Sequence, residues 1–353
     1  MNKAFFTDIK IENFKSLRSV ELKDCNRINV LIGRPNVGKS NILEALSLFS
    51  LSHNLSTFSS RFNNSFKSYI RYENEGELFF NGNADNHEPI KIHTNLVDCI
   101  VNFEDLEGLN IEYKGENYEA NIKLQLDERA GVPTMKYSLP YSQLYKTVKR
   151  YIFKADGSGR INNRNFIGRR QPSFLSPPFG NNLMQVIDSS SQLTAYYSTF
   201  FKEYGLDLVF DKSNGTVKIM KQIKGKDGEV LKTFILPYSS MADTLQRVIF
   251  YKTAIASNAD SILLFEEPEA HAFPPYIVHI TQEIINATSN QFFIATHSPF
   301  VLDDLMQNAL EELAVYIVNW KDGETVTTKL TDAQLEEVYQ YGVDLFTNIE
   351  AFI

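Results

Sequence analysis

The chain has 353 residues, of which 43% are hydrophobic, so it can bury a substantial core and is long enough for two lobes. Two cysteines are too few for a disulfide framework or a zinc site, and no apolar run approaches the roughly 20 residues of a membrane span. The net charge of −8 excludes a surface that is basic overall, so any contact with nucleic acid has to be local. We expect a globular protein of the cytoplasm that does not bind membranes.

The first 50 residues predict strands that lead into one helix. Apolar and polar side chains alternate over residues 5–11 and again over 17–22, as in half-buried strands. The run INVLI at 28–32 is typical of a fully buried strand, and 41–49 has the apolar spacing of a helix.

A complete phosphate-loop pattern, G-x-x-x-x-G-K-S, lies between the buried strand and the helix, at residues 33–40. Its glycines allow the backbone to wrap closely around a polyphosphate, with the N–H groups and the helix N-terminus facing the anion. The Lys39 ammonium is expected to reach the β- and γ-phosphates, and the Ser40 hydroxyl to reach Mg²⁺. The pattern therefore predicts binding of a nucleoside triphosphate with Mg²⁺. The predicted nucleotide-binding residues are Gly33, Asn36, Val37, Gly38, Lys39, Ser40 and Asn41.

From about 51 to 234 the composition shifts to Asn, Ser, Tyr and Phe, with short β-like pieces such as 77–80, 90–92 and 121–124. This pattern predicts an inserted, largely β lobe. Within it, residues 136–175 carry nine basic side chains against one acidic, interleaved with aromatics, as in surfaces that bind phosphate backbones and bases. A solvated face, or a patch facing an acidic partner or the chain's own acidic head, remains the alternative. The candidate contact residues are Lys149, Arg150, Arg160, Arg164, Arg169 and Arg170.

The α/β pattern resumes after residue 235 with a helix at 244–251, a buried strand at 261–265, a helix at 277–287 and strands at 291–295 and 314–318.

Two carboxylates follow the strand at 261–265, at the tip where an open α/β sheet places its ligands. Glu266 is placed to hold the Mg²⁺ shell, and Glu267 to orient or deprotonate the water that attacks the γ-phosphate. A strand that ends in a solvated acidic turn is the alternative. The next buried strand is followed by His297, which is positioned to hydrogen-bond the γ-phosphate and the attacking water. A satisfied core or surface histidine is the alternative there.

The order of these three motifs, together with the opening IKIENFKSL at 9–17, resembles the ABC-type ATPase heads of the RecF, SMC and OLD-like group, often labelled AAA ATPases. The resemblance covers 1–50 and 235–353, and it implies an α/β fold: a P-loop NTPase head of ABC type with an inserted lobe at 51–234. It also implies that residues 33–40 are Walker A, Glu266 and Glu267 are Walker B and the catalytic glutamate, and His297 is the switch histidine. Lys15 and Ser16 would lie near the base and ribose.

In the group that the chain resembles, two heads sandwich two ATP molecules, and a signature segment of one head closes the site of the other. The nearest candidate is 237–247, where we choose Ser240 as the residue that acts in trans. Ser239 remains open, and an ordinary serine cap of the following helix is the alternative. For the Q-loop glutamine, Gln171 is a guess.

Residues 51–234 lack the heptads of SMC proteins, and the segment after His297 is too short for the TOPRIM domain of OLD nucleases. We therefore expect a molecular switch that dimerises head-to-head on ATP and controls a separate effector protein, in bacterial antiphage defence or DNA maintenance. The alternative is a RecF-like ATPase clamp that acts directly on DNA. A transport ATPase is a third, weaker hypothesis.

Overall fold

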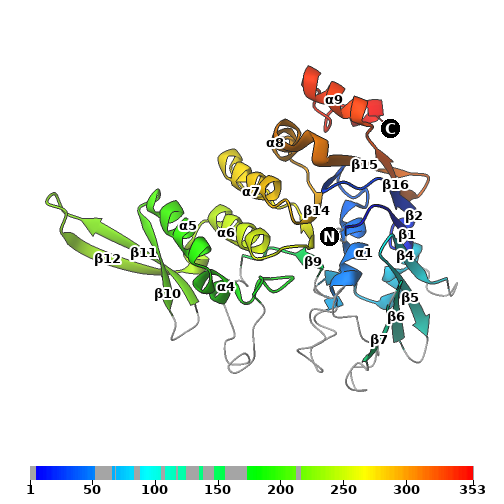
Figure 1. The fold of residues 1–353 in the computed structure, drawn as a ribbon, viewed down its shortest axis with the longest axis horizontal. Helices are drawn as coiled ribbons and strands as arrows, with labels where there is room; N and C mark the ends of the chain where they lie inside the picture. The colour runs from blue at the N-terminus through cyan, green and yellow to red at the C-terminus, as the bar shows by residue number, and fades with distance from the viewer. Residues whose placement is uncertain are drawn as a thin grey trace. The chain divides into compact units, whose positions relative to one another are not determined.

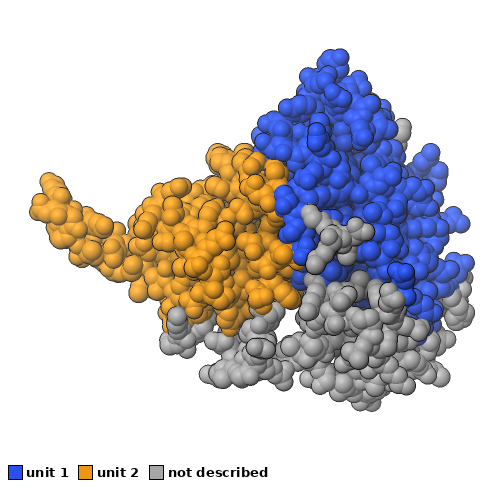
Figure 2. Space-filling model, viewed as in Figure 1, with its two compact units in different colours: residues 1–150, 260–267, 288–353 blue, residues 151–259, 268–287 orange. Residues whose placement is uncertain are grey.

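The computed structural model describes residues 5–51, 66–67, 69–82, 88–104, 108–116, 118–124, 135–137, 147–155, 173–211 and 216–352. The chain forms two compact units (Figure 2): unit 1 contains residues 1–150, 260–267 and 288–353, and unit 2 contains 151–259 and 268–287. Among the described residues, no helix combines the length and apolarity that crossing a membrane requires.

Most of the elements are labelled in Figure 1. The strands are β1 (Ile9–Phe14), β2 (Leu17–Leu22), β3 (Ile28–Ile32), β4 (Ile90–Thr94), β5 (Val97–Glu104), β6 (Gly108–Gly115), β7 (Tyr118–Leu124), β8 (Met135–Tyr137), β9 (Val148–Tyr151), β10 (Leu206–Asp211), β11 (Thr216–Lys224), β12 (Val230–Pro237), β13 (Ile262–Glu266), β14 (Gln291–Ala295), β15 (Leu313–Lys321) and β16 (Glu324–Lys329). The helices are α1 (Lys39–Ser47), α4 (Leu183–Ser189), α5 (Ser191–Lys202), α6 (Asp243–Ala256), α7 (Pro274–Asn286), α8 (Pro299–Ala309) and α9 (Asp332–Tyr341).

A six-stranded sheet of order β16-β15-β3-β14-β13-β9 places the predicted motifs. The neighbours β15, β3, β14 and β13 are mutually parallel. All five residues of β3 and of β14 are buried, which explains their largely apolar sequences. Because parallel strands end at the same edge, the residues that follow β3, β13 and β14 meet there, as open α/β sheets require for a ligand site.

A second, antiparallel sheet of seven strands also belongs to unit 1, in the order β2-β1-β4-β5-β6-β7-β8. Strand β4 pairs with the free edge of β1, from Ile9 opposite Thr94 to Glu12 opposite Lys91. The structure therefore divides the chain differently from the expected boundaries at 50 and 235. The strands β4 to β8, expected in a separate inserted lobe, instead extend the sheet that β1 and β2 begin.

Helix α1 contacts strands of both sheets of unit 1, namely β13, β14 and β1. Its residues from Ile42 to Ser47 are all buried. Beside it, the Phe6 ring packs against the rings of Phe49 and Phe293, at centroid distances of 5.7 and 6.4 Å. One core thus fastens the helix that follows the phosphate loop to the two sheets.

Unit 2 combines α4, α5, α6 and α7 with an antiparallel sheet of order β10-β11-β12. Helix α6 contacts α4, α5 and α7, and α5 contacts β10. Tyr197 of α5 donates its buried hydroxyl to the Ile249 carbonyl of α6 at 3.0 Å. The expected head, 235–353, is therefore divided, because α6 and α7 pack with the helices of unit 2.

The expected elements after residue 235 are all present, with ends that differ by a few residues. The expected β-like piece at 77–80 is wrong: residues Glu75–Leu78 form a 3₁₀ turn, and Phe79 makes an isolated bridge to Phe14. Helices α8 and α9 and strand β16 were not predicted.

Candidate nucleotide-binding site

The phosphate loop between β3 and α1 needs glycine at two positions. Gly33 has φ 154°, and an added Cβ would lie 2.2 Å from the Val318 carbonyl oxygen. Gly38, with φ 106°, would place a Cβ 2.2 Å from the Thr325 hydroxyl oxygen. Gly38 is also the N-cap of α1, and no side chain caps the first N–H groups of that helix. The helix therefore begins with N–H groups directed at the loop, where phosphate oxygens can accept them.

The Lys39 side chain spans the loop. Its Nζ donates to the carbonyl oxygens of Gly33 at 2.7 Å and Arg34 at 2.8 Å. Burial lowers the pKa of Lys39 to about 8, against the opposing effect of the Glu267 and Glu266 carboxylates. A phosphate group would supply the counter-charge that the loop carbonyls provide only in part.

A chain of hydroxyl and amide groups supports the loop from behind. The Thr325 hydroxyl of β16 donates to the Val37 carbonyl oxygen at 2.9 Å, and it lies 2.7 Å from the Ser16 hydroxyl. Since Thr325 has one hydroxyl proton, Ser16 is the donor between the two. Ser16 in turn accepts from the Asn41 amide at 2.7 Å. The structure thus brings the predicted residues Ser16 and Asn41 together against the loop, through a threonine that the sequence did not reveal.

Glu266 and Glu267 lie at the carboxyl end of β13 and face different surroundings. Glu266 is opposite Ala295 in the parallel pair β13–β14. The Glu267 N–H donates to the Ala295 carbonyl oxygen at 2.8 Å, and its φ of 43° is left-handed. Such backbone conformations cost free energy in a non-glycine residue and are common at functional sites. The turn directs the two successive carboxylates apart.

His297 follows β14 by two residues and lies beside Glu267, with 3.6 Å between His297 Nε2 and Glu267 Oε1. Burial and the charge of Lys39 lower the pKa of His297, and Glu267 opposes them. The imidazole is therefore mainly neutral at pH 7, so it can both donate and accept a hydrogen bond. The structure brings together the three predicted catalytic residues, Lys39, Glu267 and His297.

Glu266 accepts hydrogen bonds from Ser40 and from two arginines. Burial raises the pKa of Glu266, but the charges of Arg150 and Arg71 and these hydrogen bonds outweigh it, so the pKa is lowered overall. Ser40 and Glu266 thus present adjacent hydroxyl and carboxylate oxygens, which are the donors that Mg²⁺ prefers. The described part of the chain has no group of three or more His, Cys, Asp or Glu that could hold a metal alone. A metal here would take its other ligands from phosphates and water.

Glu44 of α1 is a buried carboxylate that the sequence analysis missed. It is fully buried and pairs with Lys15, with Arg71 at 2.6 Å and with Arg150 at 4.0 Å. Burial lowers the pKa of Lys15, and Glu44 opposes this most strongly. Lys15, expected near base and ribose, is therefore committed to an ion pair in this structure. The signal in the sequence was one carboxylate within an apolar helical run.

Two residues expected on a contact surface are instead buried, so this expectation is corrected. Lys149 and Arg150 lie in β9 and are each 2% exposed. Lys149 donates to the Ser261 hydroxyl at 2.8 Å, and Arg150 donates to Glu266 at 2.6 Å. Both side chains are buried and bound to partners within the protein, so neither forms part of an exposed contact surface. The other expected contact residues, and the guessed Q-loop residue, lie outside the described residues: Arg160, Arg164, Arg169, Arg170 and Gln171.

Ser239 and Ser240 are exposed and lie in a 3₁₀ turn, Tyr238–Ser240, of unit 2. Helix α6 begins at Asp243 with Ala242 as its N-cap, and no side chain caps it. The alternative of an ordinary serine cap is therefore wrong. The role of Ser240 in trans stays a prediction.

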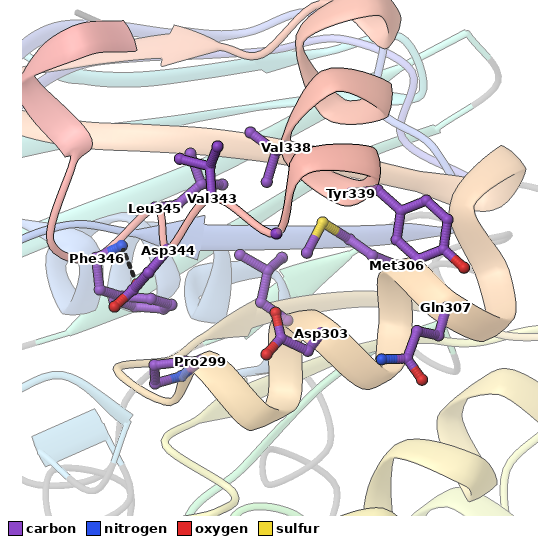
Figure 3. Close-up of a pocket in the computed structure, with 12 residues that line it drawn as sticks. Pro299, Asp303, Met306, Gln307, Val338, Tyr339, Val343, Asp344, Leu345 and Phe346 are labelled. Atoms are coloured by element: carbon purple, nitrogen blue, oxygen red, sulfur yellow. Dashed lines mark hydrogen bonds between the residues drawn. The ribbon is translucent and has the colours of Figure 1, made fainter.

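A pocket of about 210 Å³ lies elsewhere in unit 1, between α8 and the segment that includes α9 (Figure 3). Its lining includes Met306, Val338 and Tyr339, and the Phe346 N–H donates to Asp344 Oδ1 at 2.8 Å beside it. Burial and the nearby Asp344 raise the pKa of Asp303, which also lines the pocket. No residue of the phosphate loop borders this pocket, so it is separate from the nucleotide-binding site.

Known proteins resemble the chain over short and long stretches. DNA replication and repair protein RecF of Rickettsia massiliae is 43% identical over 49 residues, which are 14% of this chain and 14% of the relative. Uncharacterized protein MJECL10 of Methanocaldococcus jannaschii is 46% identical over 41 residues, which are 12% of this chain and 19% of the relative. The chain therefore spans less than one fifth of either curated relative.

The comparisons over longer stretches show the fold and the family. A crystal structure of an SMC head bound to the C-winged helix domain of ScpA has a TM-score of 0.50 and 16% identity, and it covers 95% of this chain and 99% of that chain. A family profile described as "AAA domain, putative AbiEii toxin, Type IV TA system" matches residues 28–303. The chain therefore belongs to this AAA family, and its fold is the ABC-type head of the ATPases related to SMC and RecF.

Proposed function

We propose that the chain binds and hydrolyses ATP with Mg²⁺, and that this cycle switches a partner protein. The observation that carries the proposal is the meeting of Lys39, Glu266, Glu267 and His297 at one sheet edge, beside the uncapped start of α1. A cation, an oxygen ligand for a metal, a candidate base and a histidine that can hydrogen-bond the reacting groups are what phosphoryl transfer to water can use.

Each residue has a role in the proposed reaction. Lys39 and the first N–H groups of α1 bind the phosphates and stabilise the charge that develops on them. Ser40 and Glu266 would hold Mg²⁺, which supplies further charge neutralisation when bound. Glu267 orients the attacking water and accepts its proton, while His297 hydrogen-bonds the water or the γ-phosphate.

Two variants test the proposal. Lys39→Ala should abolish ATP binding, because it removes the ammonium group that neutralises the β- and γ-phosphates. Glu267→Gln should bind ATP like the native chain, but hydrolyse it about 100-fold or more slowly, because the water loses its base. Binding is measured with a fluorescent ATP analogue, and turnover by phosphate release.

Lys23→Ala is the matched control, because this lysine pairs with Glu21 at the surface and its side chain is 69% exposed. It should bind and hydrolyse ATP at the native rate. Hydrolysis by Glu267→Gln at the native rate would show that Glu267 is not the base, and Glu266 would become the residue to examine.

The proposed output is control of a separate effector by ATP-dependent pairing of two heads in the cytoplasm, in antiphage defence or DNA maintenance. Two findings support a partner protein. The description of the matched family names a toxin of a type IV TA system, and the similar SMC head was solved with a domain of ScpA. Copurification of a protein from the source cells, lost in Lys39→Ala, would support this output.

A clamp that acts directly on DNA is the second candidate, favoured by the local identity to RecF. ATP turnover measured with and without duplex DNA separates the two candidates. Stimulation by DNA supports the clamp, whereas turnover that responds only to the copurified protein supports the switch.

A further inference from the structure

Glu266 is held by two arginines whose surroundings differ. Arg150 Nη2 lies 2.6 Å from Glu266 Oε2, and Arg71 Nη2 lies 3.3 Å from Glu266 Oε1. The side chain of Arg150 is 2% exposed, whereas that of Arg71 is 66% exposed. Each oxygen of the carboxylate therefore has its own cation, one enclosed and close, the other exposed and distant.

Arg150 cannot leave Glu266 without losing its other partners. Its guanidinium also donates to the Tyr69 carbonyl oxygen and lies 4.0 Å from the buried Glu44 carboxylate. Charged side chains this deeply buried persist only when paired, and the planar guanidinium fixes the direction of each hydrogen bond. Arg150 is therefore a rigid support for one oxygen of Glu266.

Arg71 has a stronger partner than Glu266. Its Nε donates to Glu44 Oε1 at 2.6 Å, which is closer than its 3.3 Å contact with Glu266. Release of Glu266 would leave Arg71 paired with Glu44 and its exposed end in water. The contact with Glu266 Oε1 can therefore be exchanged at small cost.

We propose that Arg150 is a positioning residue that holds Glu266 ready for the metal, and that Arg71 covers the other Glu266 oxygen only until the metal–nucleotide complex binds. The inference rests on the proposed function, and it assigns opposite effects to two arginines that contact the same carboxylate. Arg150 favours metal binding because it fixes Glu266, and Arg71 opposes it because two cations compete for Oε1.

The test is the Mg²⁺ concentration that gives half-maximal binding of a fluorescent, non-hydrolysable ATP analogue, so no turnover is needed. Arg150→Gln should raise this midpoint about tenfold or more, and Arg71→Gln should lower it severalfold. Arg150→Lys keeps the charge without the planar guanidinium and should give an intermediate midpoint. Without nucleotide and with EDTA, Arg71→Gln should also lower the melting temperature, because Glu266 then loses the cation that covers its Oε1.

The matched control is Arg27→Gln, since Arg27 is another buried arginine, 6% exposed, and pairs with Glu312 away from the site. Its midpoint should equal that of the native chain, even if its melting temperature falls. If Arg150→Gln does not fold, Arg150→Lys decides the first claim.

If a folded Arg150 variant has the same Mg²⁺ midpoint as the native chain, the positioning role is overturned and Arg150 is part of the core only. An unchanged or raised midpoint in Arg71→Gln would overturn the competition. Failure of the native chain to bind the analogue at any Mg²⁺ concentration would overturn the proposed function, and this inference with it.

Discussion

At the scale of single residues, buried charges distinguish this site. Glu44 is fully buried, and Arg150 and Lys149 are each 2% exposed. The two neighbours in β9 are stabilised differently, since Arg150 has two carboxylates nearby whereas Lys149 donates to the neutral Ser261 hydroxyl. Burial destabilises the ammonium form of Lys149 and lowers its pKa, so the stability of the fold should depend on pH through this residue.

The lowered pKa of Lys149 predicts that the free energy of unfolding rises with pH. Burial lowers its pKa to about 7, whereas a lysine in the unfolded chain titrates near 10.4. Between these values the unfolded chain binds more protons than the folded one, so the free energy of unfolding increases with pH; below about pH 7 the burial cost is fully present. Lys149→Met should flatten this increase, as measured by urea unfolding across that range.

The surface variant Lys23→Met should keep the native slope, because the Lys23 side chain is 69% exposed. Equal slopes for Lys149→Met and the native chain would show that Lys149 remains charged in the folded state.

At the scale of elements, helices α1 and α9 begin in different ways. Helix α1 begins at a glycine N-cap, which leaves its N–H groups to the loop. Helix α9 begins with a full capping box, in which Thr331 accepts from the Gln334 N–H at 3.2 Å and Gln334 Oε1 accepts from the Thr331 N–H at 2.9 Å. Helix α1, at the nucleotide-binding site, therefore keeps its first N–H groups available to an anion, whereas α9 binds its own through the capping box.

The capping box of α9 should contribute measurably to stability. Thr331→Ala removes one of its two hydrogen bonds and should lower the free energy of unfolding by about 1 kcal/mol. The measurement is urea unfolding followed by circular dichroism. Thr331→Ser keeps the hydroxyl and should stay within a few tenths of a kcal/mol of the native chain. A loss of equal size in both variants would contradict the cap and point to the methyl group instead.

At the scale of the whole molecule, the residues predicted to act on ATP are assigned to different units. Walker A, the two glutamates and His297 belong to unit 1, whereas Ser240 belongs to unit 2. In the proposed sandwich, Ser240 of one copy would complete the site of the other. Assembly should therefore depend both on bound ATP and on Ser240.

ATP-dependent assembly is therefore the prediction at this scale. With ATP and Mg²⁺, Glu267→Gln should double its mass by light scattering, because the bound state is trapped. Adding Ser240→Arg should prevent the doubling by obstructing the closed site. Adding Thr199→Arg, at an exposed position of α5 in the same unit, should not. An unchanged mass of Glu267→Gln at saturating ATP would defeat the sandwich without affecting the assignment of the phosphate loop.

The sequence alone determined the elements whose signals are local. The phosphate loop, the buried strands β3, β13 and β14 and the polar residues after them could be predicted, because glycine placement and apolar runs act over a few residues. The unit boundaries could not, since they depend on which strand edge β4 pairs with and on where α6 and α7 pack.

Only the tertiary structure decided where Arg150 and Lys149 lie. Because both belong to a run of basic residues, the sequence predicted them on a contact surface. Arg150 is 116 positions from Glu266 in sequence, and Arg71 is 195 positions from it, yet both contact its carboxylate. A charge pattern cannot distinguish a cation in solvent from one that neutralises a buried carboxylate, because the pairing depends on side chains that the fold brings together from distant elements.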